Sequence, residues 1–368
     1  MAATHSTTTS AELRAPKTPT GPRGRPLLGN LLEFRWNNLD FVVEVGRDYG
    51  DVACFRLANR PMYQVNHPDG IKHVLQDNHR NYNRDNISFT LLKPALGNGL
   101  LVTDGDFWLR QRRLMQPAFH RQRIAAFGSL MVDAAVALLG RWEAIAARRT
   151  AVNVADEMMA VTLSIATKTL FSTDISAEVE VVRRATAVIT EDFMFRLSTP
   201  FYPSLNVPTL RNRRFAATMR EIDRVVYGII AERRRSGADP GDLLSMLMEA
   251  RDEESGAAMD DRQLRDEVIT LLMAGHETTA VAMTWVWYLL SRHPAVQQRL
   301  HQELAEVLGR RTPTLDDLPK LKYTRMVIDE TMRLYPPAYY SSRNAVQDDE
   351  ICGYHIPAGA FVGISPYV

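Results

Sequence analysis

The residues most able to do chemistry lie together in Gly275-His276-Glu277-Thr278-Thr279. A glycine, an acid and two hydroxyls stand among residues that are almost all apolar, and buried polar groups are costly unless they are satisfied or used. One interpretation is structural: the two threonines bond back to carbonyls one turn earlier at a solvated kink. The other is functional: the helix is bent open beside a cofactor, and its acid and hydroxyl hand protons inward.

The stretch that positions these residues is predicted to be a helix over about 261–292, apolar on nearly every side. Such a helix belongs in the middle of a fold. At ~1.5 Å per residue it is on the order of 48 Å long, enough to cross a domain. Asp260 and Asp261 are typical of its start, and His293-Pro294 of its end.

His276-Glu277 also begins the zinc-protease signature H-E-x-x-H, in which two histidines lie one turn apart on one helix face. The second histidine would be residue 280, which is an alanine. A zinc hydrolase is therefore a remote alternative, because that face offers no paired ligand.

Two further pairs have helical spacing. Trp108 and Arg112 fall one turn apart, and an indole N–H beside a guanidinium suits a carboxylate or phosphate. The alternative is a surface helix with an interfacial tryptophan. Glu330 and Arg333 can form an ion pair, which is common on helices, but they stand directly before a Pro336-Pro337 turn.

Composition narrows the possible classes of function. The 368 residues carry a net charge of +1, which gives no indication of nucleic-acid binding. Cys54 and Cys352 form no C-x-x-C pair, as expected of a reducing compartment, so we expect a cytoplasmic protein. The sequence shows neither a secretory signal nor an apolar run approaching the ~18 residues of a membrane span.

The predicted fold is mainly α with a small β-sheet. Residues 1–17 are expected to be a disordered tail, and 18–368 a single domain. Residues 79–104 are predicted to be irregular, as a loop over a pocket. Strands near the C-terminus are expected to pair with an early hairpin. The predicted helices are 38–49, 69–76, 106–119, 124–147, 152–171, 176–195, 210–235, 241–253, 261–292, 295–308 and 322–334, and the predicted strands are 52–57, 62–66, 350–356 and 360–365.

The order of these motifs resembles a cytochrome P-450, a haem-thiolate monooxygenase. Each motif alone is weak evidence, but together they extend over residues 18–368. They are Trp108-x-x-x-Arg112, Ala274-Gly275-His276-Glu277-Thr278-Thr279, Glu330-x-x-Arg333 and the Pro336-Pro337 turn.

The resemblance implies a haem b cofactor, with Trp108 and Arg112 binding one propionate and Arg343 the other. Ala274 and Gly275 would lie over the haem and leave room for dioxygen. The substrate pocket would be lined by residues 84–100, 190–210 and 338–342.

Glu277 and Thr278 would then be catalytic, relaying protons to dioxygen as its O–O bond breaks, with Thr278 also beside the haem. Glu330 and Arg333 would be a structural pair, buried enough that losing one partner costs the fold.

The function implied is oxidation, by hydroxylation, of an apolar small molecule with O2. Electrons would come from an external ferredoxin or flavodoxin with its NAD(P)H reductase. This partner would dock near the basic 110–123 region, although such a charge run is usually only a solvated face. The region contains Arg110, Arg113, Arg121 and Arg123. The alternative, from another class, is a non-catalytic fragment or a helical binder of apolar ligands, which haem content would distinguish.

The resemblance has one departure, which concerns the iron ligand. In the family that this chain resembles, the loop that carries the iron-ligating cysteine follows the Glu-x-x-Arg helix. Neither Cys54 nor Cys352 lies in such a loop. We reject both as ligands and expect the metal-binding cysteine beyond Val368. The chain as given is then expected to be truncated and inactive alone.

Overall fold

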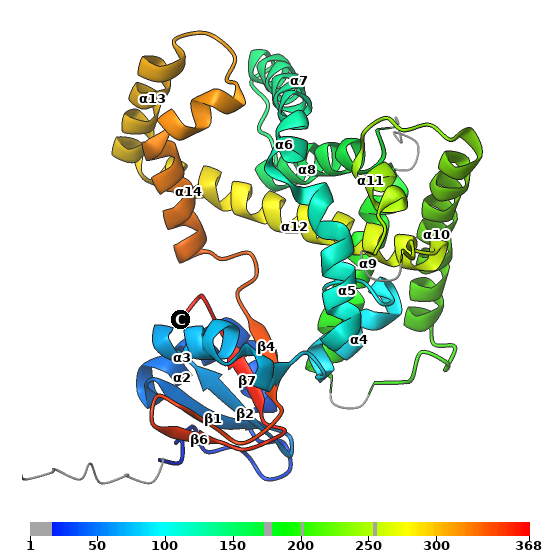
Figure 1. Ribbon diagram of the computed structural model, residues 1–368. Coiled ribbons are helices and arrows are strands. Elements are labelled where there is room, and N and C mark those ends of the chain that lie inside the picture. The colour runs from blue at the N-terminus through cyan, green and yellow to red at the C-terminus, as the bar shows by residue number, and fades with distance from the viewer. Residues whose placement is uncertain (1–16, 173–178, 200–201, 253–255) are drawn as a thin grey trace, which may run out of the picture. The chain divides into compact units, whose positions relative to one another are not determined.

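The computed structural model describes residues 17–172, 179–199, 202–252 and 256–368 (Figure 1). The chain forms two compact units, described separately below. Of the described residues, one unit comprises those in 17–83, 343–366 and 368, and the other comprises those in 84–342 and 367.

The first unit contains a five-stranded sheet in the order β1-β2-β7-β4-β3. The antiparallel hairpin of β1 (Val52–Leu57) and β2 (Arg60–Val65) pairs through β2 with the parallel strand β7 (Phe361–Ile364). The predicted pairing of C-terminal strands with the early hairpin is therefore confirmed. Strand β3 (Tyr82–Asn83) pairs with β4 (Ser341–Ala345). The unit also contains α1 (Leu31–Trp36), α2 (Asn38–Tyr49), α3 (Pro68–Lys72) and a π-helical turn (His73–Asp77).

The single strand predicted at 350–356 is wrong, because the chain reverses direction there. Strands β5 (Asp349–Ile351) and β6 (Tyr354–Ile356) form a hairpin around the two-residue turn Cys352-Gly353. Both turn residues have positive φ, 51° and 79°, as the tightest hairpin turns require. Cys352 is therefore at an exposed turn.

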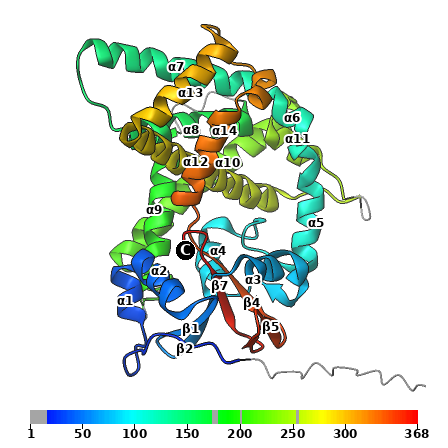
Figure 2. The same cartoon turned by 90° about the vertical axis from the view of Figure 1, so that its left-hand side faces the viewer.

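The second unit is helical (Figure 2). The helix predicted at 261–292 is confirmed as α12 (Asp261–Arg292), and α8 runs against it. The other helices are α4 (Ile87–Leu96), α5 (Gly105–Met115), α6 (Arg121–Ala126), α7 (Gly128–Ala147), α8 (Val154–Phe171), α9 (Val179–Ser198), α10 (Leu210–Ser236), α11 (Leu243–Glu249), α13 (Pro294–Leu308) and α14 (Lys322–Leu334).

Helix α4 lies where an irregular segment was predicted. The Asn86 side chain accepts a hydrogen bond from the Ser88 amide (3.1 Å) and caps the helix. Pro94 inside the helix and Gly97 at its end hide the helical pattern in the sequence.

One helical stretch, 121–147, is long and apolar enough to be a candidate membrane span, which by itself is weak evidence for one. Length and composition are the only grounds for this, and 22% of the apolar segment is buried.

The first half of α12 is buried in the main core of this unit. Leu264, Val268 and Ile269 pack there with apolar side chains of α8 and α10. This part of the helix also buries three consecutive charged residues, Arg265, Asp266 and Glu267. Isolated charges are very costly in such a place, so each needs partners.

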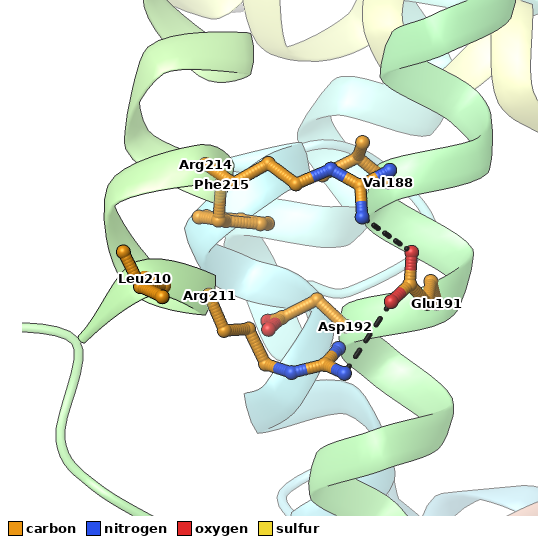
Figure 3. Close-up of a pocket in the computed structure, with 7 residues that line it drawn as sticks. All are labelled: Val188, Glu191, Asp192, Leu210, Arg211, Arg214 and Phe215. Carbon is orange, nitrogen blue, oxygen red and sulfur yellow. Dashed lines mark hydrogen bonds and ion pairs between the residues drawn. The ribbon is translucent and has the colours of Figure 1, made fainter.

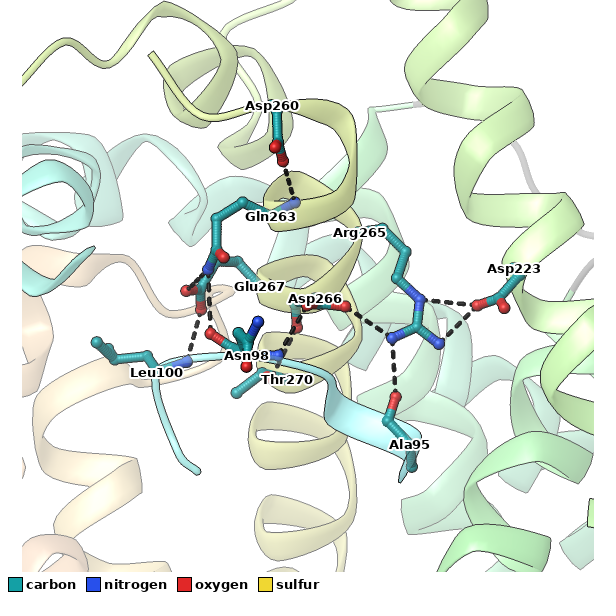
Figure 4. Close-up of polar contacts among 10 residues, drawn as sticks. All are labelled: Ala95, Asn98, Leu100, Asp223, Asp260, Gln263, Arg265, Asp266, Glu267 and Thr270. Atoms are coloured by element: carbon teal, nitrogen blue, oxygen red, sulfur yellow. Dashed lines mark hydrogen bonds and ion pairs between the residues drawn. The ribbon is translucent and has the colours of Figure 1, made fainter. Parts of the chain in front are cut away.

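Figure 4 shows where those partners come from. Arg265 donates to Asp223 of α10 (2.7 Å), to Asp266 (2.8 Å) and to the Ala95 carbonyl (3.0 Å). Asp266 accepts a hydrogen bond from the Asn98 amide (2.7 Å).

Glu267 is held in the same way. It accepts from the Leu100 amide (2.9 Å) and from the Gln263 side chain (2.7 Å). Burial raises the pKa of Glu267 to about 7, against the opposing effect of these two hydrogen bonds. The folded protein thus retains a proton here over a pH range in which an exposed glutamate has lost it.

The unfolding free energy should therefore depend on pH through Glu267. Between the ordinary pKa of 4.5 and about 7 the folded state binds this proton and the unfolded state does not. The stabilisation is fully present below pH 4.5 and is lost as the pH rises through 7. Relative to Glu267→Gln, the wild type should lose roughly 2 to 3 kcal/mol between pH 5 and pH 8, measured by urea unfolding.

Glu306→Gln provides the control. Glu306 accepts from Gln302 across one helical turn (2.9 Å), as Glu267 does from Gln263, but in an exposed position. The wild type and this control should show parallel pH curves. If the Glu267→Gln curve also ran parallel to the wild type, the elevated pKa would be wrong.

Candidate functional site

The middle of α12 presents a face of small and hydroxyl side chains to solvent. Ala274, Gly275, Thr278 and Thr279 are exposed, although the helix is apolar on both sides of them. The Thr278 hydroxyl donates to the Ala274 carbonyl (2.6 Å), and the Thr279 hydroxyl donates to the Gly275 carbonyl (2.8 Å). The predicted back-bonding of the threonines is confirmed, whereas the predicted opening of the helix is not seen, because the α-helix is continuous here.

Glu277 turns toward α9, where its carboxylate accepts a hydrogen bond from the Thr190 hydroxyl (3.1 Å). Thr190 lies in the predicted 190–210 pocket segment, but its bond to Glu277 was not predicted, because the two residues are far apart along the chain. The Glu277 side chain is half-buried, next to the exposed Thr278.

His276 is fully buried, and its Nε2 lies 3.1 Å from the Met159 carbonyl of α8. Burial lowers the pKa of His276, which favours the neutral imidazole. Within the described residues no cluster of three or more His, Cys, Asp or Glu side chains could hold a metal ion. His276 is thus a core residue.

A second group of candidate residues lies on α5. The Trp108 ring is flanked by two guanidinium groups, with the Cζ of Arg84 5.1 Å and that of Arg112 5.0 Å from the ring centre. The predicted proximity of Trp108 and Arg112 is confirmed. Arg84 was not predicted as a carboxylate-binding residue, because α4 separates it from α5 along the chain and only the fold brings it to the indole.

Asp104 fixes the start of this cluster. Its carboxylate caps α5 by accepting from the Gly105 amide (3.0 Å) and also accepts from the Arg84 amide. The Arg84 side chain donates to the Thr103 carbonyl (3.1 Å). Burial lowers the pKa of the Arg84 guanidinium, which outweighs the opposing effect of Asp104.

The donor set of this cluster fits the carboxylates of a haem. Two guanidinium groups lie over one indole ring, and Arg112 is exposed. Two neighbouring like charges favour an added anion, and guanidinium groups bind carboxylates well. Arg343, the other predicted propionate donor, belongs to β4 and to the other compact unit, so its role remains a prediction.

The Glu330–Arg333 pair forms and is exposed in this structure, and its structural role in the intact protein stays a prediction. Arg333 donates to both carboxylate oxygens of Glu330 (2.7 and 2.6 Å). The two side chains are 55% and 66% exposed, because Thr331 is the buried residue of α14. An exposed pair of this kind contributes little to the stability of the described unit.

Neither cysteine has the features of a metal ligand. Cys54 lies in β1 and Cys352 in the turn between β5 and β6, and both are free thiols. Burial raises the pKa of the half-buried Cys54 thiol, and partial desolvation raises that of the Cys352 thiol at its exposed turn; both effects oppose formation of the thiolate. The rejection of both residues as iron ligands stays a prediction.

A cavity of about 210 Å³ lies between α9 and α10 (Figure 3). Glu191 is paired there with Arg211 (3.3 Å) and Arg214 (3.0 Å). The cavity is smaller than the ~300–1,000 Å³ usual for ligand sites, so it is not by itself a substrate chamber. It is lined by Val188, Glu191, Asp192, Leu210, Arg211, Arg214 and Phe215, in part within the predicted 190–210 segment.

Comparison with known proteins agrees with these observations. The sequence is 38% identical over 346 residues to cyclooctat-9-en-7-ol 5-monooxygenase of Streptomyces melanosporofaciens, covering 94% of this chain and 74% of that protein. It is 37% identical to cyclooctatin synthase of the same organism, covering 94% of this chain and 75% of that protein. It is 31% identical to pentalenene oxygenase of Streptomyces avermitilis, covering 94% and 76%. The cytochrome P-450 family profile matches residues 19–368, and the chain belongs to that family.

Proposed function

We propose that the intact protein oxidises a cyclic terpene hydrocarbon or its alcohol. Membership of the family makes it a haem-dependent monooxygenase that acts with O2 on an apolar small molecule. Two of the similar proteins are named for cyclooctat-9-en-7-ol and for pentalenene, which supports a cyclic substrate here.

One structural observation carries the proposal: the exposed Ala274, Gly275 and Thr278 face in the middle of an otherwise apolar helix. Small side chains leave space beside the helix axis for a reacting group. A hydroxyl in that space can accept and pass on a proton at Oγ1. Glu277, oriented by Thr190, stands next to it as a carboxylate that can exchange protons with solvent.

Haem, when bound, supplies the redox chemistry that activates dioxygen. Arg84, Trp108 and Arg112 are the residues of this unit that we assign to its carboxylates. Their task is to hold and orient the cofactor, whereas Glu277 and Thr278 move protons. We also infer a cytoplasmic location, because both cysteines are free.

The substrate class can be tested directly. The protein, supplied with a bacterial ferredoxin, its reductase and ¹⁸O2, should convert a cyclic terpene or terpene alcohol into a product with one labelled oxygen. A straight-chain fatty acid of equal carbon number serves as the comparison. Labelled fatty-acid product together with unchanged terpene would contradict the proposal.

Thr278→Ala should divert electrons from product to hydrogen peroxide, because a proton carrier at Oγ1 is lost. The product formed per NAD(P)H consumed should fall on the order of tenfold, below the usual range for positioned proton donors. Thr279→Ala is a matched control, since Thr279 is also exposed and bonded one turn back. An equal yield of product per NAD(P)H consumed in wild type and Thr278→Ala would disprove the role assigned to Thr278.

The electron donor is proposed to be an acidic ferredoxin or flavodoxin that docks on the basic 110–123 region. Arg113, Arg121 and Arg123 are exposed there, while Arg110 lies 3.9 Å from Asp252. Charge reversal at Arg121 and Arg123 together should lower the association rate about tenfold at low salt and reduce its salt dependence. Charge reversal at the exposed Arg310 is the control and should change neither the association rate nor its salt dependence. If it had the same effect as reversal at Arg121 and Arg123, the proposed docking on the 110–123 region would be wrong.

A further inference from the structure

The segment 97–103 connects α4 to α5, and α12 holds it through its backbone. The Asn98 amide donates to Asp266 (2.7 Å), and the Leu100 amide donates to Glu267 (2.9 Å). The Gln263 side chain donates to the Asn98 carbonyl (3.1 Å) as well as to Glu267. Side chains of α12 thus hold this short segment through two of its backbone amides, those of Asn98 and Leu100.

The contact between segment and helix is too close for side chains. A Cβ on Gly97 would lie 2.1 Å from a carboxylate oxygen of Asp266, and one on Gly99 would lie 2.0 Å from the Thr270 hydroxyl. Gly97 also has a positive φ of 56°, which favours glycine. The segment therefore has one closely defined position against α12.

From this segment the contacts continue to the guanidinium cluster. The Thr103 hydroxyl donates to the Gly99 carbonyl (3.1 Å), and the Thr103 carbonyl accepts from Arg84 (3.1 Å). Arg84 in turn lies over Trp108. An unbroken series of hydrogen bonds and one ring contact thus joins the carboxylates of α12 to the cluster on α5.

Packing alone would not favour carboxylates at positions 266 and 267 of α12. The Asp266 side chain is 3% exposed, and Glu267 is completely buried. Apolar residues would fill such positions at lower cost, but they could not fix two backbone amides in direction. The carboxylates therefore define the orientation of the segment in addition to filling the space.

We propose that Asp266 and Glu267 are positioning residues, which hold segment 97–103 against α12 and thereby place Arg84, Trp108 and Arg112 to receive the haem carboxylates. This inference rests on the proposed role of that cluster. Neither acid touches the haem in this proposal, and both act through the segment.

The test compares Glu267→Ala and Gly99→Ala, which release the segment by different means, in the full chain. Amide hydrogen exchange measures how firmly segment 97–103 is held, and haem titration followed by absorbance measures how well the cluster binds haem. Both variants should lower protection of the Leu100 amide at least about tenfold and weaken haem affinity by a similar factor. Glu267→Gln keeps an acceptor oxygen for the Leu100 amide and should restore both quantities. Glu306→Ala, at an exposed position, should change neither.

Arg112→Ala separates this inference from the function on which it rests. If Arg112→Ala leaves haem affinity unchanged, the cluster does not bind the carboxylates and both ideas are wrong. If Arg112→Ala weakens haem binding while a freed segment leaves it unchanged, only the positioning role is wrong. Failure of Glu267→Gln to restore affinity while Leu100 protection returns would also overturn it.

Discussion

Charged groups removed from water need partners, and three of them lie in succession near the start of α12. Desolvating each costs several kcal/mol, and their mutual attraction recovers this only with good geometry and further hydrogen bonds. Arg265 and Asp266 satisfy part of this need between themselves. The remainder comes from Asp223 of α10, the Ala95 carbonyl of α4 and two amides of segment 97–103. The placement of these elements against α12 therefore depends on polar contacts as well as on apolar packing.

The sequence predicted the long elements well, because periodicity and end signals agreed in them. Helix α12 carries a capping Asp260 and ends before Pro294, and its bounds were found without structural information. Helix α4 was missed because Pro94 and Gly97 are ordinarily signs of irregular chain. The Cys352-Gly353 turn was missed because two short strands and a turn occupy the length of one strand.

For the candidate site, the local part could be predicted and the non-local part could not. Helical spacing was enough to place Trp108 beside Arg112, and to pair Glu330 with Arg333. It could not reveal Arg84, whose position depends on bonds from its backbone and side chain to residues 103 and 104. Nor could spacing predict burial, which depends on what packs over a helix face, and so the exposure of the Glu330–Arg333 pair was unexpected.

The unbroken α-helix at residues 274–279 limits how Thr278 can act. Its hydroxyl hydrogen is directed at the Ala274 carbonyl, 2.6 Å away, so in this conformation Oγ1 is available as an acceptor but not as a donor. To pass on a proton the hydroxyl must rotate about its C–O bond and give up that hydrogen bond. Such a bond contributes only about 1 kcal/mol net, which is small beside the barriers of oxidative chemistry. The proposed relay therefore does not require the helix to open, because it needs only a hydroxyl that alternates between its own backbone and an exposed partner.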